Sequence, residues 1–128
     1  MTIRKKILCI EDEPDMIELV RLILERKGFD FRGADSGQVG LDMIREEKPD
    51  LVLLDLMMPG MDGWEVYRQL KADAELKDIP VIVVTAKAQS IDRVLGLHIA
   101  RVDAYITKPF GPQELLDSIG NILNMKIA

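Results

Sequence analysis

Short apolar runs alternate with longer amphipathic stretches along the whole chain. The short runs predict strands at residues 6–10, 30–34, 51–55, 80–85 and 104–107. The amphipathic stretches predict helices at residues 14–27, 63–72, 91–100 and 112–125, and a further helix that Ser36 caps and that ends before Pro49. Five strands that alternate in this way with five helices predict an α/β domain, in which helices cover both faces of a parallel sheet.

The first predicted helix and the third predicted strand carry the clearest patterns. In the helix, apolar residues at positions 16, 17, 19, 20, 23 and 24 lie along one face. Pro14 stands near its start and Gly28 just beyond its end, where these two residue types are favoured. In the strand, residues 51–54 are apolar without a break, which is typical of a strand buried on both faces of a sheet.

Composition limits the domain organisation and the classes of partner. The 128 residues suffice for one core and 48% of them are hydrophobic, so we expect a single domain over residues 1–128. The net charge of −5 disfavours a general nucleic-acid binder, whose surface would carry a basic patch. No stretch has the length of a signal-peptide core or of a membrane span. We therefore expect a cytoplasmic protein, in which the single cysteine, Cys9, is an inert buried thiol.

The apolar run at residues 51–54 ends in an acid, Asp55, which a proline–glycine turn follows closely. A buried carboxylate without a partner is costly, so Asp55 either caps the following loop or is held there for chemistry. For this residue taken alone, capping is the favoured interpretation, because Asp is a common turn residue.

Polar residues also stand where the other predicted strands end. Glu11 and Asp12 follow the first strand, Thr85 ends the fourth, and Lys108 follows the fifth. In a doubly wound parallel sheet, ligands bind beyond the carboxyl ends of the strands. We therefore expect these four residues and Asp55 to meet at one edge of the sheet.

Three carboxylates in one crevice repel one another, by about 4 kcal/mol for two unit charges 4 Å apart at an effective dielectric constant near 20. A divalent cation removes this repulsion, and oxygen ligands favour Mg²⁺ over zinc. With the cation bound, a phosphoryl group can lie beside Asp55, where Thr85 can donate a hydrogen bond and Lys108 can contribute positive charge. These residues therefore predict phosphoryl transfer to a carboxylate.

Four segments of the chain stand out together: CIEDEP, LVLLDLMMPGMDGWEV, PVIVVTA and YITKPF. Their sequence, order and spacing resemble the response-regulator receiver domains of two-component signalling, over about residues 5–125. The resemblance implies a flavodoxin-like (βα)5 fold with the strand order 2-1-3-4-5.

The same resemblance implies a role for each acid at the sheet edge. Asp55 would be the phosphoacceptor. Mg²⁺ would be held by Glu11, Asp12 and Asp55 together with the backbone carbonyl of Met57.

Thr85 and Lys108 would contact the phosphoryl oxygens. The Lys108–Pro109 peptide bond is expected to be cis, which would direct Lys108 into the site. Tyr105 would be a switch residue that turns inward when Thr85 moves toward the phosphoryl group, although the residues alone favour an ordinary strand aromatic.

The implied function is a phosphorylation-dependent signalling switch. A histidine kinase, a phosphotransfer protein or a small phosphodonor would phosphorylate Asp55, and the surface of the fourth helix, fifth strand and fifth helix would change to control a downstream protein. The domain would catalyse only its own phosphorylation and dephosphorylation, so we do not expect an enzyme. We expect no direct nucleic-acid binding and no membrane association. Because the last helix is poor in basic residues, we expect a monomer or weak dimer, either stand-alone or part of a longer regulator.

The lifetime of the phosphorylated state depends on the side chains that could hold an attacking water. The resemblance places Met57 and Lys87, two residues beyond Asp55 and Thr85, nearest to that water. A thioether accepts hydrogen bonds poorly and a charged lysine cannot act as a base, so slow loss of the phosphoryl group is expected. The alternative is that Met57 packs on the loop and leaves the site open.

Other functions on a sheet of this kind have less support. A receiver-like module that binds a partner without phosphorylation is the main alternative, and the presence of all five site residues argues against it. A phosphatase that forms an aspartyl phosphate would need a second carboxylate where Met57 stands. A flavin-binding protein would need a phosphate-binding loop in place of the acidic EDEP, and a P-loop hydrolase is excluded because its glycine-rich loop is absent.

Overall fold

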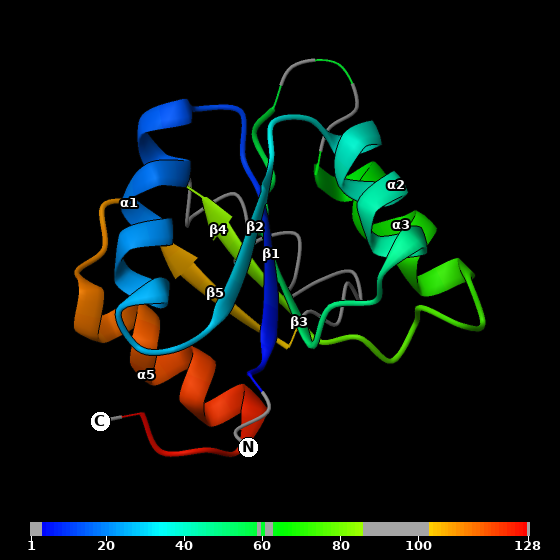
Figure 1. Cartoon of the computed structure of the whole chain (residues 1–128). Helices are drawn as coiled ribbons and strands as arrows, with labels where there is room; N and C mark the ends of the chain where they lie inside the picture. The colour runs from blue at the N-terminus through cyan, green and yellow to red at the C-terminus, as the bar shows by residue number, and fades with distance from the viewer. Residues whose placement is uncertain (1–3, 59, 61–62, 86–102, 128) are drawn as a thin grey trace.

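The computed structural model describes residues 4–58, 60, 63–85 and 103–127 (Figure 1). In this part of the chain strands and helices alternate. The strands are β1 (Lys6–Ile10), β2 (Asp30–Ala34), β3 (Leu51–Asp55), β4 (Val81–Thr85) and β5 (Ala104–Thr107). The helices are α1 (Pro14–Glu25), α2 (Gly37–Glu46), α3 (Gly63–Ala72) and α5 (Pro112–Leu123).

The predicted strands are confirmed, with one difference at a boundary. Strand β4 begins at Val81, one residue after its predicted start at Pro80. Pro80 has no N–H for the strand ladder, although its carbonyl accepts a hydrogen bond from the Val52 N–H at 3.0 Å. The predicted cap of α2 is also confirmed, because the Ser36 hydroxyl accepts a hydrogen bond from the Val39 N–H at 3.2 Å.

Two helices end earlier than predicted. Helix α1 stops at Glu25, because the following turn passes through Gly28 with a φ of +86°, a conformation open to glycine. Helix α5 stops at Leu123, because Asn124 adopts a left-handed φ of 54°. The predicted helix at residues 91–100 lies outside the described residues.

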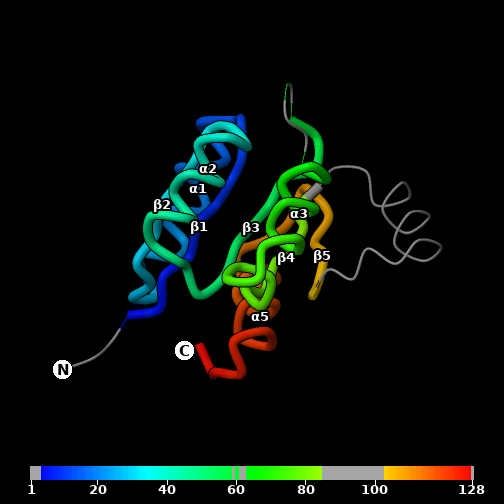
Figure 2. The backbone as a smooth tube through the Cα atoms, turned by 90° about the vertical axis from the view of Figure 1, so that its right-hand side faces the viewer, coloured from blue at the N-terminus to red at the C-terminus, as the bar shows by residue number. Residues whose placement is uncertain are grey.

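The five strands form one parallel sheet in the order β2-β1-β3-β4-β5. Figure 2 shows the strands in this sequence from left to right. The order reverses direction between β1 and β3, which are the first and third strands of the chain and lie at the centre of the sheet. The predicted doubly wound fold is therefore confirmed.

Helices cover both faces of this sheet. Helices α1 and α5 lie on one face, and α2 and α3 on the other (Figure 1). Strand β3 supplies both cores: Leu51 and Leu53 pack with the α1/α5 side, whereas Val52 and Leu54 pack with the α2/α3 side. The unbroken apolar sequence of β3 follows from this double burial.

Parallel pairing brings the carboxyl ends of the strands to one edge. Asp55 pairs with Val84, and Thr85 pairs with Thr107, the residue before Lys108. On the other side of β3, Ile10 pairs with Leu54, so that Glu11 follows β1 at the level of Asp55. The fold therefore gathers the polar residues that end β1, β3, β4 and β5.

Candidate functional site

Asp55 is a buried carboxylate at the carboxyl end of β3, with 3% of its surface exposed. Its Oδ1 accepts a hydrogen bond from the Met57 N–H at 3.0 Å, and its Oδ2 lies 3.6 Å from the Lys108 Nζ. The loop therefore fixes one oxygen, while the other faces a cation. Asp55 thus has both a hydrogen bond to its own turn and an ion pair with Lys108, which follows a strand distant in the sequence.

Glu11 and Asp12 follow β1 directly and lie next to Asp55. Glu11 is buried, and its Oε2 accepts a hydrogen bond from the Glu13 N–H at 3.2 Å. Its backbone N–H donates to the Ala34 carbonyl at the end of β2, which fixes the point where the chain leaves the sheet. Asp12 is half-buried. One carboxylate oxygen each of Glu11, Asp12 and Asp55 lies within 4.8 Å of the other two.

Lys108 brings a positive charge to these acids from the end of β5. The Lys108–Pro109 peptide bond is cis. The Lys108 Nζ donates to Glu11 Oε1 at 2.6 Å and lies 3.5 Å from Glu13 Oε1, in addition to its contact with Asp55. Three carboxylates therefore surround the ammonium group of Lys108, whose side chain is 13% exposed.

The balance of charge in the site shifts two pKa values. The pKa of Glu11 is raised to about 7, mainly by burial and in part by the charge of Asp55, against the opposing hydrogen bond from Lys108. Burial lowers the pKa of Lys108, but its hydrogen bond to Glu11 and the charges of Asp55 and Glu13 outweigh burial and raise it above its ordinary value. Without a metal the site thus holds more negative charge than Lys108 offsets.

The three acids fit a small hard cation. Their closely spaced ligand atoms are all carboxylate oxygens, which Mg²⁺ prefers, and the cation would offset the excess negative charge. The thiol of Cys9 is no competing ligand, because it is buried and burial raises its pKa to about 12. The predicted fourth ligand, the Met57 carbonyl, belongs to the loop that follows Asp55.

The remaining predicted residues lie around this centre. Thr85 ends β4 in backbone pairing with Thr107, and its side chain is outside the described part. Tyr105 lies in β5 opposite Val83 and is 42% exposed. The Met57 side chain is 52% exposed, and Lys87 is not among the described residues.

Two residues near Asp55 were not assigned to the site from the sequence. Glu13 contacts Lys108. Its position in the acidic segment EDEP, next to Glu11 and Asp12, could have indicated that it belongs to the site. Gly63 begins α3 against the backbone of Asp55, where a Cβ would lie 2.6 Å from Leu56 Cα. From the sequence, Gly63 is predicted only as a helix start, because its contact with a strand eight residues earlier leaves no local pattern.

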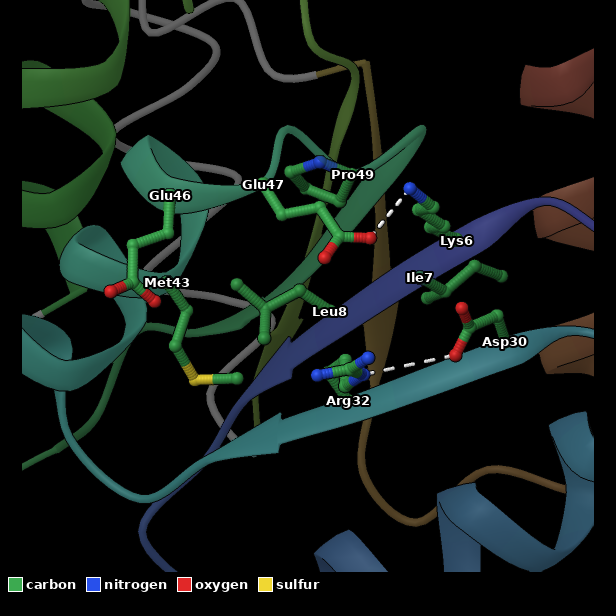
Figure 3. A pocket seen from close by; sticks show the side chains of 9 residues that line it. All are labelled: Lys6, Ile7, Leu8, Asp30, Arg32, Met43, Glu46, Glu47 and Pro49. Atoms are coloured by element: carbon green, nitrogen blue, oxygen red, sulfur yellow. Dashed lines mark ion pairs between the residues drawn. The ribbon is translucent and has the colours of Figure 1, made fainter.

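A cavity of about 130 Å³ lies away from the site formed by Glu11, Asp12 and Asp55 (Figure 3). It lies between α2 and the first residues of β1, with Leu8 and Met43 in its lining. Its charged residues are largely paired with one another, Lys6 with Glu47 and Arg32 with Asp30, as the dashed lines in Figure 3 mark. We therefore place the candidate site at the acidic edge and not in this cavity.

Comparisons with known proteins agree with this fold. The family model described as "Response regulator receiver domain" matches residues 7–120. The chain is 44% identical over 115 residues to the "DNA-binding response regulator MtrA" of Mycolicibacterium smegmatis and to that of Mycobacterium tuberculosis strain H37Rv. Each match covers 90% of this chain and 49% of the relative, so the chain spans about half the length of these curated relatives.

Solved structures resemble the chain over nearly its whole length. A sensor protein from Polaromonas sp. JS666 has a TM-score of 0.87 at 30% identity, covering 97% of this chain and 100% of that chain. The signal receiver domain of a signal transduction histidine kinase from Syntrophus aciditrophicus has a TM-score of 0.85 at 32% identity, covering 94% and 90%. The Vibrio cholerae chemotaxis protein CheY4 matches in fold, with a TM-score of 0.82 at 20% identity, covering 94% and 99%.

The fold and the matches define a doubly wound receiver of the two-component signalling class. The chain belongs to the response regulator receiver domain family. Among the described residues, no helix is both long and apolar enough to cross a membrane.

One expectation is wrong. From the sequence we expect no direct nucleic-acid binding, whereas the relatives are named DNA-binding response regulators. That expectation used the net charge of this chain, which matches about half of each relative and carries no information on the other half. The net charge of a receiver domain therefore does not indicate whether a longer regulator that contains it binds DNA.

Proposed function

We propose that this domain accepts a phosphoryl group on Asp55 in a Mg²⁺-dependent reaction, and that the phosphorylated form transmits a signal. The observation that carries the proposal is the environment of Asp55. A buried carboxylate is held by a backbone N–H on one oxygen and faces Lys108 on the other, beside two further acids. This arrangement supplies a fixed nucleophile, a cation for phosphoryl oxygens and a set of metal ligands.

Each residue has a distinct role in the proposed reaction. Glu11, Asp12, Asp55 and the Met57 carbonyl would hold Mg²⁺, which when bound supplies positive charge against the acids and the phosphoryl oxygens. An Asp55 oxygen attacks phosphorus, the bond from phosphorus to the donor's leaving group breaks, and that group departs with the electron pair. Lys108 exchanges part of its contact with Glu11 for a phosphoryl oxygen, where its charge stabilises the transition state.

The signal is proposed to pass through the β4 and β5 end of the sheet. Thr85 would donate to the phosphoryl group, and Tyr105, which is 42% exposed, would turn inward in response. The domain would act on itself alone and would not be an enzyme for other substrates. Since relatives are named DNA-binding response regulators, we include control of a DNA-binding activity among the outputs of this switch.

The experiment is to measure intact mass after incubation with Mg²⁺ and acetyl phosphate. We expect a gain of one phosphoryl group in the wild type and none in Asp55→Asn. Asp78→Asn is a matched control, because Asp78 is exposed and precedes β4 at the opposite edge of the sheet. No gain in the wild type would favour an interaction module that needs no phosphorylation, and an equal gain in Asp55→Asn would refute Asp55 as the acceptor.

A further inference from the structure

Glu13 is an acid of the site to which the proposed reaction gives no role. It is the N-cap residue of α1, but its side chain forms no capping hydrogen bond. Instead its Oε1 lies 3.5 Å from the Lys108 Nζ. Glu11 and Asp55, the other partners of Lys108, are buried, whereas the Glu13 side chain is 65% exposed. Glu13 therefore lies on the solvent side of Lys108.

Glu13 is also close to the proposed phosphoacceptor. Because the Lys108 Nζ lies 3.5 Å from Glu13 Oε1 and 3.6 Å from Asp55 Oδ2, these two oxygens are at most about 7 Å apart. At this separation in water, two unit charges interact by about as much as the thermal energy, and salt at physiological strength screens part of it. A donor that approaches Asp55 thus passes within the field of the Glu13 carboxylate.

The charge of Glu13 is offset only in part by the groups that the reaction uses. The acids whose oxygens lie together as candidate metal ligands are Glu11, Asp12 and Asp55. The single charge of Lys108 is shared among Glu11, Glu13, Asp55 and, in the proposed reaction, the phosphoryl oxygens. An exposed negative charge then remains beside a site that must admit an anion.

We propose that Glu13 is a specificity-determining residue that disfavours small phosphodonors according to their negative charge. The inference rests on the proposed function and deepens it, because it concerns the class of donor that phosphorylates Asp55. Donors with two negative charges are repelled more strongly than donors with one. Direct phosphorylation by dianionic metabolites is thereby restrained.

The test compares two donors on the intact chain with saturating Mg²⁺. Acetyl phosphate is a dianion near neutral pH, and phosphoramidate carries one net negative charge. For Glu13→Gln, we expect the second-order rate constant to rise about threefold with acetyl phosphate and less than about twofold with phosphoramidate. For Glu13→Lys, the rises are about ninefold and about threefold, and both effects shrink as ionic strength increases.

Glu18 supplies the matched control. Its side chain is also 65% exposed on α1, but its ion pair is with Arg21 rather than with Lys108. We expect Glu18→Gln and Glu18→Lys to leave the ratio of the two rate constants unchanged. Folding is expected to survive at Glu13, because its side chain caps no backbone group.

Each outcome decides the inference. A greater rise for acetyl phosphate than for phosphoramidate supports it. Equal rises in the rate constant for both donors would overturn it. They would mean that the substitution releases Lys108 from Glu13, and not that Glu13 discriminates between donors by their charge. A fall for both donors would also overturn it, in favour of a role for Glu13 in positioning Lys108. Absence of phosphorylation of the wild type by either donor would contradict the proposed function itself, which distinguishes the two failures.

Discussion

Gly63 links helix α3 to the backbone of the proposed phosphoacceptor. Its N–H donates to the Leu56 carbonyl at 3.3 Å. A Cβ at this position would overlap the Asp55 carbonyl oxygen and would lie 2.6 Å from Leu56 Cα. Both are backbone atoms next to the Asp55 side chain and cannot rotate away. Gly63→Ala therefore forces either α3 or the end of β3 to move.

The expected cost has two parts of opposite sign. Replacing glycine by alanine in a helix interior stabilises the helix by about 1 kcal/mol, which is an upper bound for Gly63 because this residue begins α3. Overlap in a packed region costs about 1–3 kcal/mol, and backbone contacts place Gly63→Ala at the upper end of that range. We expect a net loss of about 2 kcal/mol in the free energy of unfolding, which lowers the Tm by about 8 °C for a domain of this size. Where the shift falls on the end of β3, Asp55 is displaced, and phosphorylation is then expected to slow by about tenfold.

Urea unfolding followed by circular dichroism measures this loss. Gly111→Ala is the control, because a Cβ there has no neighbour within 4 Å and the backbone φ of −91° suits any residue. We expect the control to change stability by less than about 1 kcal/mol, the scale of an N-cap preference. If Gly63→Ala were as stable as the wild type, or more stable, helix propensity would outweigh the contact and the reasoning would be refuted.

Three further predictions concern the acidic site. In metal-free protein the folded pKa of Glu11 is about 7 and its ordinary value is 4.5, so between these values the folded state binds more protons than the unfolded state. The free energy of unfolding therefore falls as pH rises through this window, by at most roughly 3 kcal/mol. Urea unfolding in the presence of a chelator measures this dependence on pH, which we expect to be steeper in the wild type than in Glu11→Gln. In calorimetric titration we expect Mg²⁺ to bind, and Asp12→Ala to reduce the affinity by about tenfold or more, because one of three carboxylate ligands is lost. After phosphorylation, we expect Met57→Asn to speed dephosphorylation several-fold because its amide can orient a water, and Met57→Ala to speed it less.

Each of these has a contrary result. Stability that rises with pH across the window would show that another group dominates the linkage. Mg²⁺ binding that is unchanged in Asp12→Ala would refute that ligand. Equal dephosphorylation rates for the wild type and both Met57 variants would mean that this side chain does not shield the phosphoryl group.

Local patterns of the sequence were sufficient for most of the fold. A strand buried on both faces must be apolar at successive positions, as residues 51–54 are, and an amphipathic helix must repeat its apolar positions with the helical period, as α1 does. Helix ends were less predictable, because the left-handed turn at Asn124 depends on one residue whose backbone the preceding pattern does not determine.

The order of apolar and polar residues was enough to predict the alternation of strands and helices. It also placed Glu11, Asp12, Asp55, Thr85 and Lys108 at strand ends, because burial and backbone hydrogen bonding leave a periodic pattern in the residues. Which of these groups touch depends on the three-dimensional fold and could not be predicted from that pattern. The contact of Lys108 with Glu11 and Glu13 joins residues about a hundred positions apart, and it depends on the paths of two loops beyond the sheet edge. The raised pKa of Glu11 and the close approach of Gly63 to Asp55 also depend on how the chain folds in three dimensions. Burial, charge balance and steric overlap are properties of three-dimensional neighbours, and a linear pattern does not record them.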